Sequence, residues 1–274
     1  MQISEIYIER FSHGKHSATK DFVAVEEPLE IRLVSWFKGR RESRTVAITM
    51  RTPGHDAELS LGFLFTEGVV QRAEDVVAIT PAGLPPHNEI LVELKQDVEV
   101  DWARLERHFY ATSSCGVCGK TSLDALELKG LSAPAVNTPL ITSELVQSLP
   151  AKLREHQEGF ARTGGLHASA WFTPSGEMPL VREDVGRHNA LDKLIGAALQ
   201  SGTPLLREGV LLVSGRASFE LLQKSLAAGI PVVVAVGAPS SLAVELAERF
   251  QMTLIGFLRG EQFNVYTGGW RIRQ

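Results

Sequence analysis

The chain holds two cysteines, Cys115 and Cys118, and both lie in the segment SSCGVCGK. The thiolate is the reactive form of cysteine, and its pKa falls from about 8.5 toward roughly 3.5–7.5 in CxxC motifs, beside cations or at helix N-termini. Lys120 supplies a nearby cation, and Thr121 could cap a helix that starts just after the motif. The flanking glycines let such a loop reach a partner or fold back over a ligand. The spacing therefore predicts a reactive pair of thiols.

Three kinds of thiol chemistry stay open for this pair. One cysteine could accept a sulfur atom as a persulfide and pass it on, the pair could cycle between dithiol and disulfide, or it could supply half of a structural zinc site. Structural zinc normally needs four protein ligands, and the sequence has neither a second CxxC nor a histidine pair at zinc-finger spacing. Thioredoxin-type exchange places its CxxC between a strand and a long helix, whereas this motif lies mid-chain among Gly and Ser.

A second polar cluster lies in the segment REDVGRHNALD, residues 182–192. Asp184, His188 and Asp192 are spaced i, i+4, i+8 and share one face of a helix if that helix begins by Asp184. A surface ladder of ion pairs would have the same spacing, but the density of Arg, His, Asn and Asp favours contact with a ligand. His167 is a similar candidate, although a lone histidine entering a strand is more often a core or turn residue. We predict Asp184, His188 and His167 as ligand contacts.

Small and hydroxyl residues follow the apolar runs near the end of the chain. VLLV runs into Ser214, Gly215, Arg216 and Ser218, VVVAV runs into GAPSS, and a third run enters FLRGEQ, residues 257–262. Helix N-termini favour anions, and ligands of open α/β sheets bind outside the carboxyl ends of the strands, where the three segments would gather. The pattern suits a phosphate-bearing ligand, but neither GxGxxG nor GxxxxGK(S/T) occurs, so no dinucleotide fingerprint or P-loop is supported.

The first 111 residues predict a small, β-rich α+β domain. Residues 22–50 alternate apolar and polar side chains in three short runs, FVAVEE, LEIRLVSW and RTVAITM, which indicates a hairpin or meander. The next segment, TPGHDAELSLGFLFTEGVV, changes to a helical period after Pro53 and Gly54, and EILVELK near residues 89–95 is typical of another strand. The composition of residues 112–142, rich in Gly, Ser, Thr and Pro, predicts a loop that carries the CxxC, with a short helix near LDALEL.

Residues 143–274 alternate helices and strands regularly, which predicts an α/β domain. A helix over SELVQSLPAKLREHQ, interrupted or bent near Pro150, precedes strands at LHASAWFT and MPLVRE and a helix over DVGRHNALDKLIGAALQ. The runs VLLVS, PVVVAV and MTLIGFL are apolar throughout, as in strands covered on both faces, and amphipathic helices separate them. Gly229 is placed to end one of these helices. This β-α-β-α-β order predicts parallel strands with right-handed crossovers.

Bulk composition is that of an ordinary globular protein. The chain has 274 residues, 44% hydrophobic and 22% charged, with a net charge of −4. Nothing in this balance indicates a nucleic-acid partner, which requires clustered Lys and Arg. No apolar run approaches about 18 residues, so we expect no membrane span. The first residues lack the features of a secretory signal, and we expect a cytoplasmic protein, in which a structural disulfide is disfavoured.

Taken together, the chain resembles the formate dehydrogenase accessory sulfurtransferases over nearly its whole length. Six motifs carry the resemblance, in this order: TPGHDAELSLGFLFTEGVV, SSCGVCGK, RTGGLHASA, REDVGRHNALDKL, VSGRASFELLQKS and GFLRGEQFNVYTG. It implies that Cys115, with Cys118 as its partner, accepts sulfur from an L-cysteine desulfurase as a persulfide. It also implies that the sulfur passes to the bis(molybdopterin guanine dinucleotide) molybdenum cofactor, which is bound as a substrate before it enters formate dehydrogenase.

The same resemblance implies a fold and an assembly. The C-terminal half is expected to be a three-layer α/β domain like that of cytidine deaminases, and the protein is expected to form a homodimer. From the residues themselves we expect no tightly bound metal, because only two thiols are available as ligands. The segment that contacts the cofactor falls on Phe257, Leu258, Arg259, Gly260, Glu261 and Gln262.

Two other functions are alternatives to sulfur transfer for a chain with these motifs. Zinc deaminases use H-x-E followed downstream by P-C-x-x-C, with the glutamate moving protons. Here the CxxC precedes His167, and the next residues are Ala168 and Ser169, so the required glutamate is missing. The alternative that is not an enzyme is a chaperone, which would bind the molybdenum cofactor in its pocket and would need neither thiol.

Overall fold

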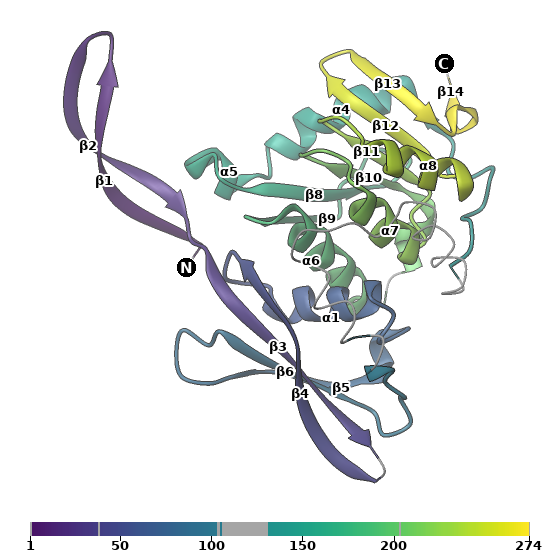
Figure 1. Ribbon diagram of the computed structural model, residues 1–274. Coiled ribbons are helices and arrows are strands. Elements are labelled where there is room, and N and C mark those ends of the chain that lie inside the picture. Colours follow the sequence, from purple (N-terminus) through teal and green to yellow (C-terminus); the bar gives the residue numbers. More distant parts are fainter. Residues whose placement is uncertain (1, 38, 103–104, 106–130, 203, 274) are drawn as a thin grey trace.

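The computed structural model describes residues 2–37, 39–102, 105, 131–202 and 204–273. Cys115, Cys118 and the short helix predicted near LDALEL lie outside the described residues. A four-stranded and a six-stranded sheet form the two halves of the molecule, and helices α1 (Asp56–Thr66) and α6 (Arg187–Gln200) lie between them (Figure 1). The mixed α/β class predicted from the sequence is therefore confirmed.

The four-stranded sheet has the order β4-β3-β6-β5 and pairs β3 with β6 in parallel. Its strands are β3 (Glu27–Phe37), β4 (Arg40–Arg51), β5 (Val76–Ala82) and β6 (Glu89–Leu94), and the 3-10 turn η1 spans Ala73–Asp75. Alternate residues of a strand point to one face, and Leu29, Ile31 and Leu33 of β3 are fully buried in a core shared with α1. The predicted strands at β3, β4 and β6 and the helix are confirmed, whereas β5 was not predicted.

A long hairpin precedes this sheet and projects from the body (Figure 1). It consists of β1 (Ile3–Ser12) and β2 (Lys15–Ala24), joined by His13 and Gly14. Both of these residues have positive φ, as in the two-residue turns that match the twist of a hairpin. The predicted meander began at residue 22 and missed most of the hairpin. Tyr7 and Phe11 are 77% and 75% exposed, so no buried face imposes the alternation that sequence patterns detect.

The six-stranded sheet has the order β13-β12-β11-β10-β8-β9. Its strands are β8 (His167–Phe172), β9 (Leu180–Asp184), β10 (Val210–Val213), β11 (Val232–Ala235), β12 (Thr253–Arg259) and β13 (Gln262–Thr267). The three central strands β10, β11 and β12 are parallel, as predicted, and the flanking pairs are antiparallel. The short strands β7 (Ile141–Thr142) and β14 (Ile272–Arg273) pair beside this sheet.

Helices cover both faces of this sheet, which makes three layers. Leu211 and Val213 of β10 pack in the core formed with α6, α7 (Phe219–Ala227) and α8 (Ser241–Arg249). Val210 and Leu212 point to the other face and pack with α4 (Ser143–Arg154). The remaining elements are α5 (Glu158–Thr163), η2 (Pro204–Glu208) and η3 (Gly269–Arg271). Strands buried on both faces are apolar at every position, which explains their continuous hydrophobic runs.

Two helix predictions need correction and one is confirmed. Helix α6 begins at Arg187, after an N-cap at Gly186, because Asp184 is still paired with His167 in the β8–β9 ladder. Asp184 therefore does not share a helical face with His188. Helix α4 runs through Pro150 without interruption. Gly229, with φ of 73°, ends α7 as predicted: the next amide donates to the carbonyl of Ser225.

The two halves meet where α1 and α6 touch backbone to backbone. A Cβ on Gly62 of α1 would overlap the carbonyl oxygen of Asp192, and a Cβ on Gly196 of α6 would overlap the carbonyl oxygen of Glu58. Both glycines have an ordinary helical conformation, so glycine is not required here for its backbone freedom. Its contribution is the absence of a side chain, which lets the helix axes approach closely. This contact joins the two sheets into one body.

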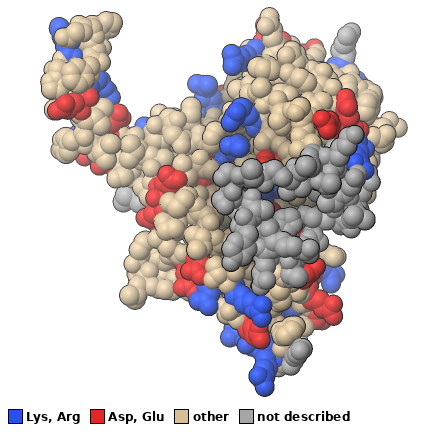
Figure 2. All heavy atoms as spheres, viewed as in Figure 1, with Lys and Arg blue, Asp and Glu red and all other residues tan. Residues whose placement is uncertain are grey.

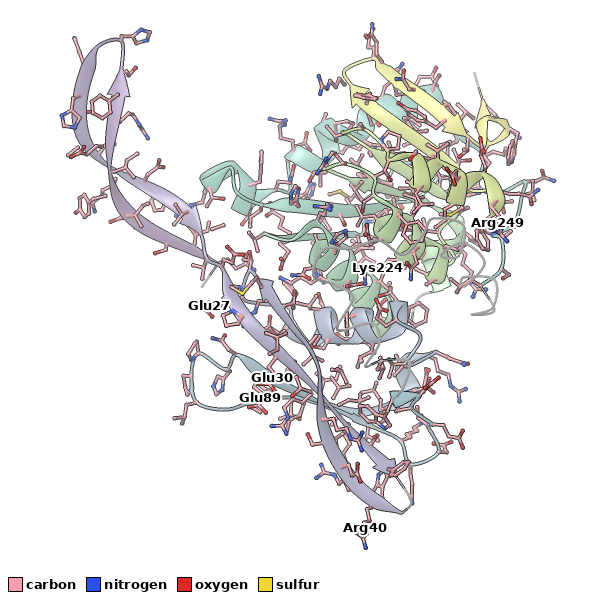
Figure 3. All side chains as sticks on the ribbon, in the orientation of Figure 1. Glu27, Glu30, Arg40, Glu89, Lys224 and Arg249 are labelled. Atoms are coloured by element: carbon pink, nitrogen blue, oxygen red, sulfur yellow. The ribbon has the colours of Figure 1, made fainter. Side chains whose placement is uncertain are left out.

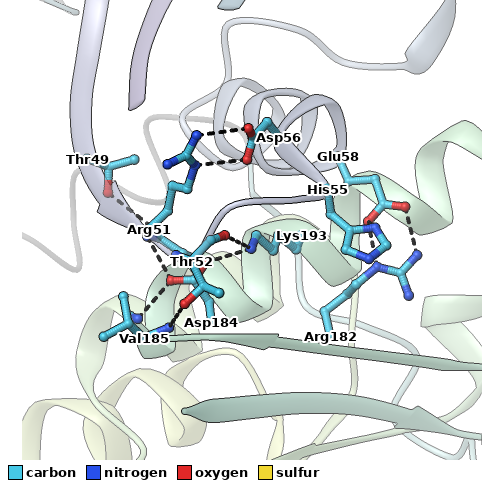
Figure 4. Close-up of polar contacts among 12 residues, drawn as sticks. Thr49, Arg51, Thr52, His55, Asp56, Glu58, Arg182, Asp184, Val185 and Lys193 are labelled. Carbon is cyan, nitrogen blue, oxygen red and sulfur yellow. Dashed lines mark hydrogen bonds and ion pairs between the residues drawn. The ribbon is translucent and has the colours of Figure 1, made fainter. Parts of the chain in front are cut away.

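A buried ion pair beside this contact joins three segments (Figure 4). Lys193 of α6 lies 2.7 Å from Asp184 at the end of β9, and both side chains are fully buried. The amide of Thr52, just after β4, donates to Asp184 at 3.1 Å, and its carbonyl accepts from Lys193 at 2.8 Å. Nearby, burial alone would raise the pKa of the Glu58 carboxyl, but hydrogen bonds from Arg182 and His55 lower it to about 2.

A second buried cluster of polar side chains lies at the other end of the α1–α6 contact. Lys224 of α7, which is labelled in Figure 3, lies 2.9 Å from Asp192 and also donates to Thr66, the last residue of α1. Burial alone would lower the pKa of Lys224, but the carboxylate of Asp192 raises it. Asp192, which the sequence placed on a ligand-contacting face, is instead 2% exposed and part of this interior cluster.

We expect Gly196→Ala to destabilise the protein by about 2 kcal/mol or more, because the new methyl group must displace the backbone of α1. Alanine has the higher helix propensity by about 1 kcal/mol, so an uncrowded helix would gain stability from the same change. Denaturation by urea measures the free energy of unfolding. Gly165→Ala is the control, because its Cβ would make only ordinary contacts at 3.6 Å or more. Equal or greater stability of Gly196→Ala would contradict the close approach.

Candidate functional site

The loops that follow the three parallel strands lie side by side at one edge of the six-stranded sheet. The amide of Gly237 donates to the carbonyl of Gly215 at 3.0 Å, and the amide of Phe257 donates to the carbonyl of Gly237 at 3.1 Å. A further bridge joins Ala217 to Pro239. The structure thus brings together the three segments that the sequence predicted to gather, and the N-termini of α7 and α8 begin there.

Phe257 interrupts the ladder between β12 and β13. Its φ is 54°, in the left-handed region that non-glycine residues rarely adopt, and the register of the two strands shifts between Gly256 and Arg259. The bulge leaves the Phe257 side chain 41% exposed beside the loops just described. Such strained residues are found most often at binding and catalytic sites.

The predicted segment 257–262 does not act as a single loop. Leu258 is 1% exposed and packs in the core against α4, so its side chain is part of the core rather than of the exposed turn. Gly260 and Glu261 form the turn to β13, and the carbonyl of Glu261 accepts from Gln147 of α4 at 2.9 Å. Arg259, Gly260, Glu261 and Gln262 are exposed at this turn.

Two histidines lie near the end of β10, between the first turns of α6 and α7. His188 Nε2 is 3.3 Å from the Ser218 hydroxyl, and a Cβ on Gly215 would lie 3.3 Å from Nδ1 of His167. Burial, with a smaller contribution from Arg187, lowers the pKa of His188 to about 4. Burial and Arg187 also lower the pKa of His167, against the opposing charge of Asp184. Both imidazoles are therefore neutral near pH 7 and can donate or accept hydrogen bonds.

Asp184 is not available to a ligand, which corrects the sequence prediction. Its side chain is fully buried, and its oxygens accept from the amide of Thr52, the ammonium of Lys193, the amide of Gly186 and the side chain of Asn189. Two other predicted contacts lie near the histidines. The Ser214 hydroxyl accepts from the amide of Ala168 at 2.9 Å, and Arg216 is exposed on the loop.

Charges of both signs are interspersed on the face shown in Figure 2, and no continuous basic surface is visible on its described part. Within the described ranges, no group of three or more His, Cys, Asp or Glu side chains is arranged to hold a metal ion. No helix in that part of the chain is both long and apolar enough to cross a membrane.

A sizeable cavity lies elsewhere. It has a volume of about 790 Å³ and is lined by the end of α1, the C-terminal end of α7, Arg207 and residues 131–135. The candidate site lies at the N-terminal end of α7, at the opposite end of that helix. The chemistry favours the sheet edge as the site, because neutral histidines, hydroxyls and two helix N-termini gather there.

We expect protonation of His188 to oppose folding. Its pKa is about 4 in the folded chain and about 6.5 when unfolded, so the unfolded chain binds more protons between these values and stability falls as pH falls. Chemical denaturation at pH 7 and pH 5 should show a smaller loss of stability in His188→Gln than in the wild type. We expect a difference on the order of 1 kcal/mol, reduced because the side chain is 36% exposed. His156→Gln, an exposed control, should behave as the wild type does.

Comparison with known proteins identifies the family. Residues 24–273 match the sequence model of the FdhD/NarQ family. The sulfur carrier protein FdhD of Streptomyces coelicolor is 50% identical over 271 residues, covering 96% of this chain and 93% of that protein. The protein of that name in Mycobacterium tuberculosis is 49% identical over 259 residues, covering 91% of each. A crystal structure assigned as a formate dehydrogenase accessory protein, from Desulfotalea psychrophila, covers all of both chains with a TM-score of 0.74 at 23% identity, which shows a shared fold. The resemblance drawn from the six motifs is confirmed, and the chain belongs to the FdhD/NarQ family.

Proposed function

We propose that this chain is a sulfur carrier protein that serves formate dehydrogenase, and that it transfers sulfur through a persulfide on Cys115. The observation that carries the proposal is the close relationship to sulfur carrier proteins over more than nine tenths of the chain. The two cysteines of the sequence, both in one CxxC, are the groups able to hold sulfur covalently.

The chemistry follows from thiol–disulfide exchange. The Cys115 thiolate attacks the outer sulfur of the persulfide on an L-cysteine desulfurase, the sulfur–sulfur bond breaks, and the desulfurase leaves as a thiolate. Attack by Cys118 on the Cys115 persulfide then releases the outer sulfur as hydrosulfide and leaves a disulfide, which a cellular dithiol reduces. Lys120 follows Cys118 by two residues in the sequence, and a neighbouring cation is one of the features that favour the thiolate form of cysteine.

The substrate that receives the sulfur is the bis(molybdopterin guanine dinucleotide) molybdenum cofactor, which we place at the carboxyl edge of the six-stranded sheet. Diphosphate groups suit the N-termini of α7 and α8, because helix N-termini favour anions. The residues that would contact it are His167, His188, Ser214, Gly215, Arg216, Ser218, Phe257, Arg259, Gly260, Glu261 and Gln262. Leu258 and Asp184 were also predicted as contacts, but their side chains are buried, and the proposal does not use them.

The finer assignment of fold and partners belongs to the same proposal. A mixed sheet with parallel central strands and helices on both faces supports a cytidine-deaminase-like domain at residues 143–274, after a smaller domain at residues 1–111 and a linker at 112–142. We further propose a cytoplasmic homodimer that docks with the desulfurase and with formate dehydrogenase and holds no permanent metal.

We expect incubation with a cysteine desulfurase and L-cysteine to add one or more sulfur atoms to the protein, measured as intact mass. Cys115→Ala should abolish the activation of formate dehydrogenase, because the receiving thiolate is gone. Cys118→Ala is the matched control, since it retains that thiolate and should still gain mass. Full activation by Cys115→Ala would rule out the persulfide role, and full activation by the double variant would support the chaperone function instead.

We expect GDP, which represents half of one arm of the cofactor, to bind the protein more tightly than AMP. Hydrogen bonds to charged groups contribute roughly 1.5–3 kcal/mol, so Arg216→Ala or Arg259→Ala should weaken binding about tenfold to a hundredfold in calorimetry. Arg154→Ala removes an exposed arginine of α4 and should bind as the wild type does. If GDP does not bind, or if neither loop arginine changes its affinity, the cofactor site is elsewhere.

A further inference from the structure

The hairpin of β3 and β4 extends beyond the sheet to which it belongs. Strand β6 pairs with residues 30–34 of β3, whereas β3 continues to Phe37, which pairs with Arg40 of β4. In the described part of the chain, residues 35–37 therefore have no second strand beside them. The end of the hairpin projects from the four-stranded sheet (Figure 1). We call residues 36–44 the basic tip.

The basic tip concentrates positive charge on a chain that is negative as a whole. Its sequence, WFKGRRESR, has four basic residues and one acidic residue, whereas the chain has a net charge of −4. Arg41 is paired with Glu93 and Arg44 with Glu42. Arg40 has no ion pair within the described ranges, and Figure 3 shows its side chain pointing away from the body. Such a charge attracts an acidic surface over roughly 8–10 Å near physiological ionic strength.

Two aromatic residues accompany these arginines. Trp36 is 38% exposed and Phe37 is 44% exposed. Charged side chains on an edge strand protect it from pairing with other chains, and that role alone would explain the arginines. It does not explain exposed aromatic rings next to them. Tryptophan, phenylalanine and arginine are enriched at protein interfaces, and tryptophan and arginine contribute most often to the binding energy. The composition of the basic tip is therefore that of a surface that binds another protein.

The position of the basic tip suits the partner that supplies sulfur. The Arg44 guanidinium lies over the ring of Trp102, 4.8 Å from its centroid. Cys115 follows Trp102 by thirteen residues, so the chain places this cysteine within roughly 45 Å of that ring. Strands β12 and β13, which flank the proposed cofactor site, lie at the other end of the molecule (Figure 1). A protein bound to the basic tip would therefore leave the cofactor site uncovered.

We propose that the basic tip is the docking surface for the sulfur donor, and that it fits an acidic surface on that donor. The inference rests on the proposed function, in which an L-cysteine desulfurase loads the chain with sulfur. The arginines accelerate the encounter by long-range attraction, and Trp36 and Phe37 become buried in the complex. The basic tip recognises the donor and takes no part in the transfer of sulfur, which remains with the thiols.

The test measures the rate at which a cysteine desulfurase with L-cysteine loads the full chain, followed as intact mass at increasing chain concentration. Arg40→Glu should raise the KM for the chain several-fold at low salt and leave kcat unchanged, because it weakens the encounter and not the chemistry. High salt should reduce this difference. Trp36→Ala should raise KM about tenfold. Arg154→Glu, a reversal at an exposed arginine of α4, is the matched control and should load as the wild type does.

Unfolding in urea verifies that each variant is folded before its loading is compared. Equal KM values for Arg40→Glu and the wild type at low salt would overturn the docking surface. An equal rise of KM in Arg154→Glu would also overturn it, because the donor would then respond to net charge alone. If Arg40→Glu loads normally but activates formate dehydrogenase poorly, the basic tip serves the acceptor instead. Failure of the desulfurase to load the wild type would contradict the sulfur carrier function itself, so the two failures are distinguishable.

Discussion

The buried pair of Asp184 and Lys193 is the constraint to which the rest of the structure conforms. Two fully buried charges are costly to remove from water unless they are paired and hydrogen-bonded, and here the backbone of Thr52 satisfies both of them. That residue belongs to the N-terminal half, whereas the pair belongs to the C-terminal half. The two halves therefore have to meet in one register, because a slip by one residue would remove the hydrogen bonds that the backbone of Thr52 makes to both charges.

The glycines at the α1–α6 contact make this geometry possible. Gly62 and Gly196 allow the helices to approach until backbone meets backbone, which brings Thr52 within reach of α6. The same contact positions the start of α6, where Arg187 and His188 lie. Asp184 also influences the candidate site electrostatically. Its charge tends to raise the pKa of His167, whereas burial and Arg187 lower it.

The candidate site combines contributions from several strands, as is usual at the carboxyl edge of an α/β sheet. Neutral histidines, hydroxyl groups and the bulged Phe257 come from four separate segments held by backbone hydrogen bonds between adjacent loops. The strands position these loops, and the two cysteines lie on the segment that links the two halves of the sequence. This division suits the proposed function, in which one part receives sulfur and the other holds the acceptor.

The sequence by itself determined the elements whose pattern is local. The apolar runs of β10, β11 and β12, the turn at Gly229 and the CxxC can be recognised within a few residues, and ordered motifs were sufficient to recognise the family. The tertiary structure alone decided the roles of polar residues, because burial and pairing depend on distant segments. Asp184 had the spacing of a ligand contact but pairs with Lys193, and Leu258, which follows the bulge at Phe257, is buried in the core.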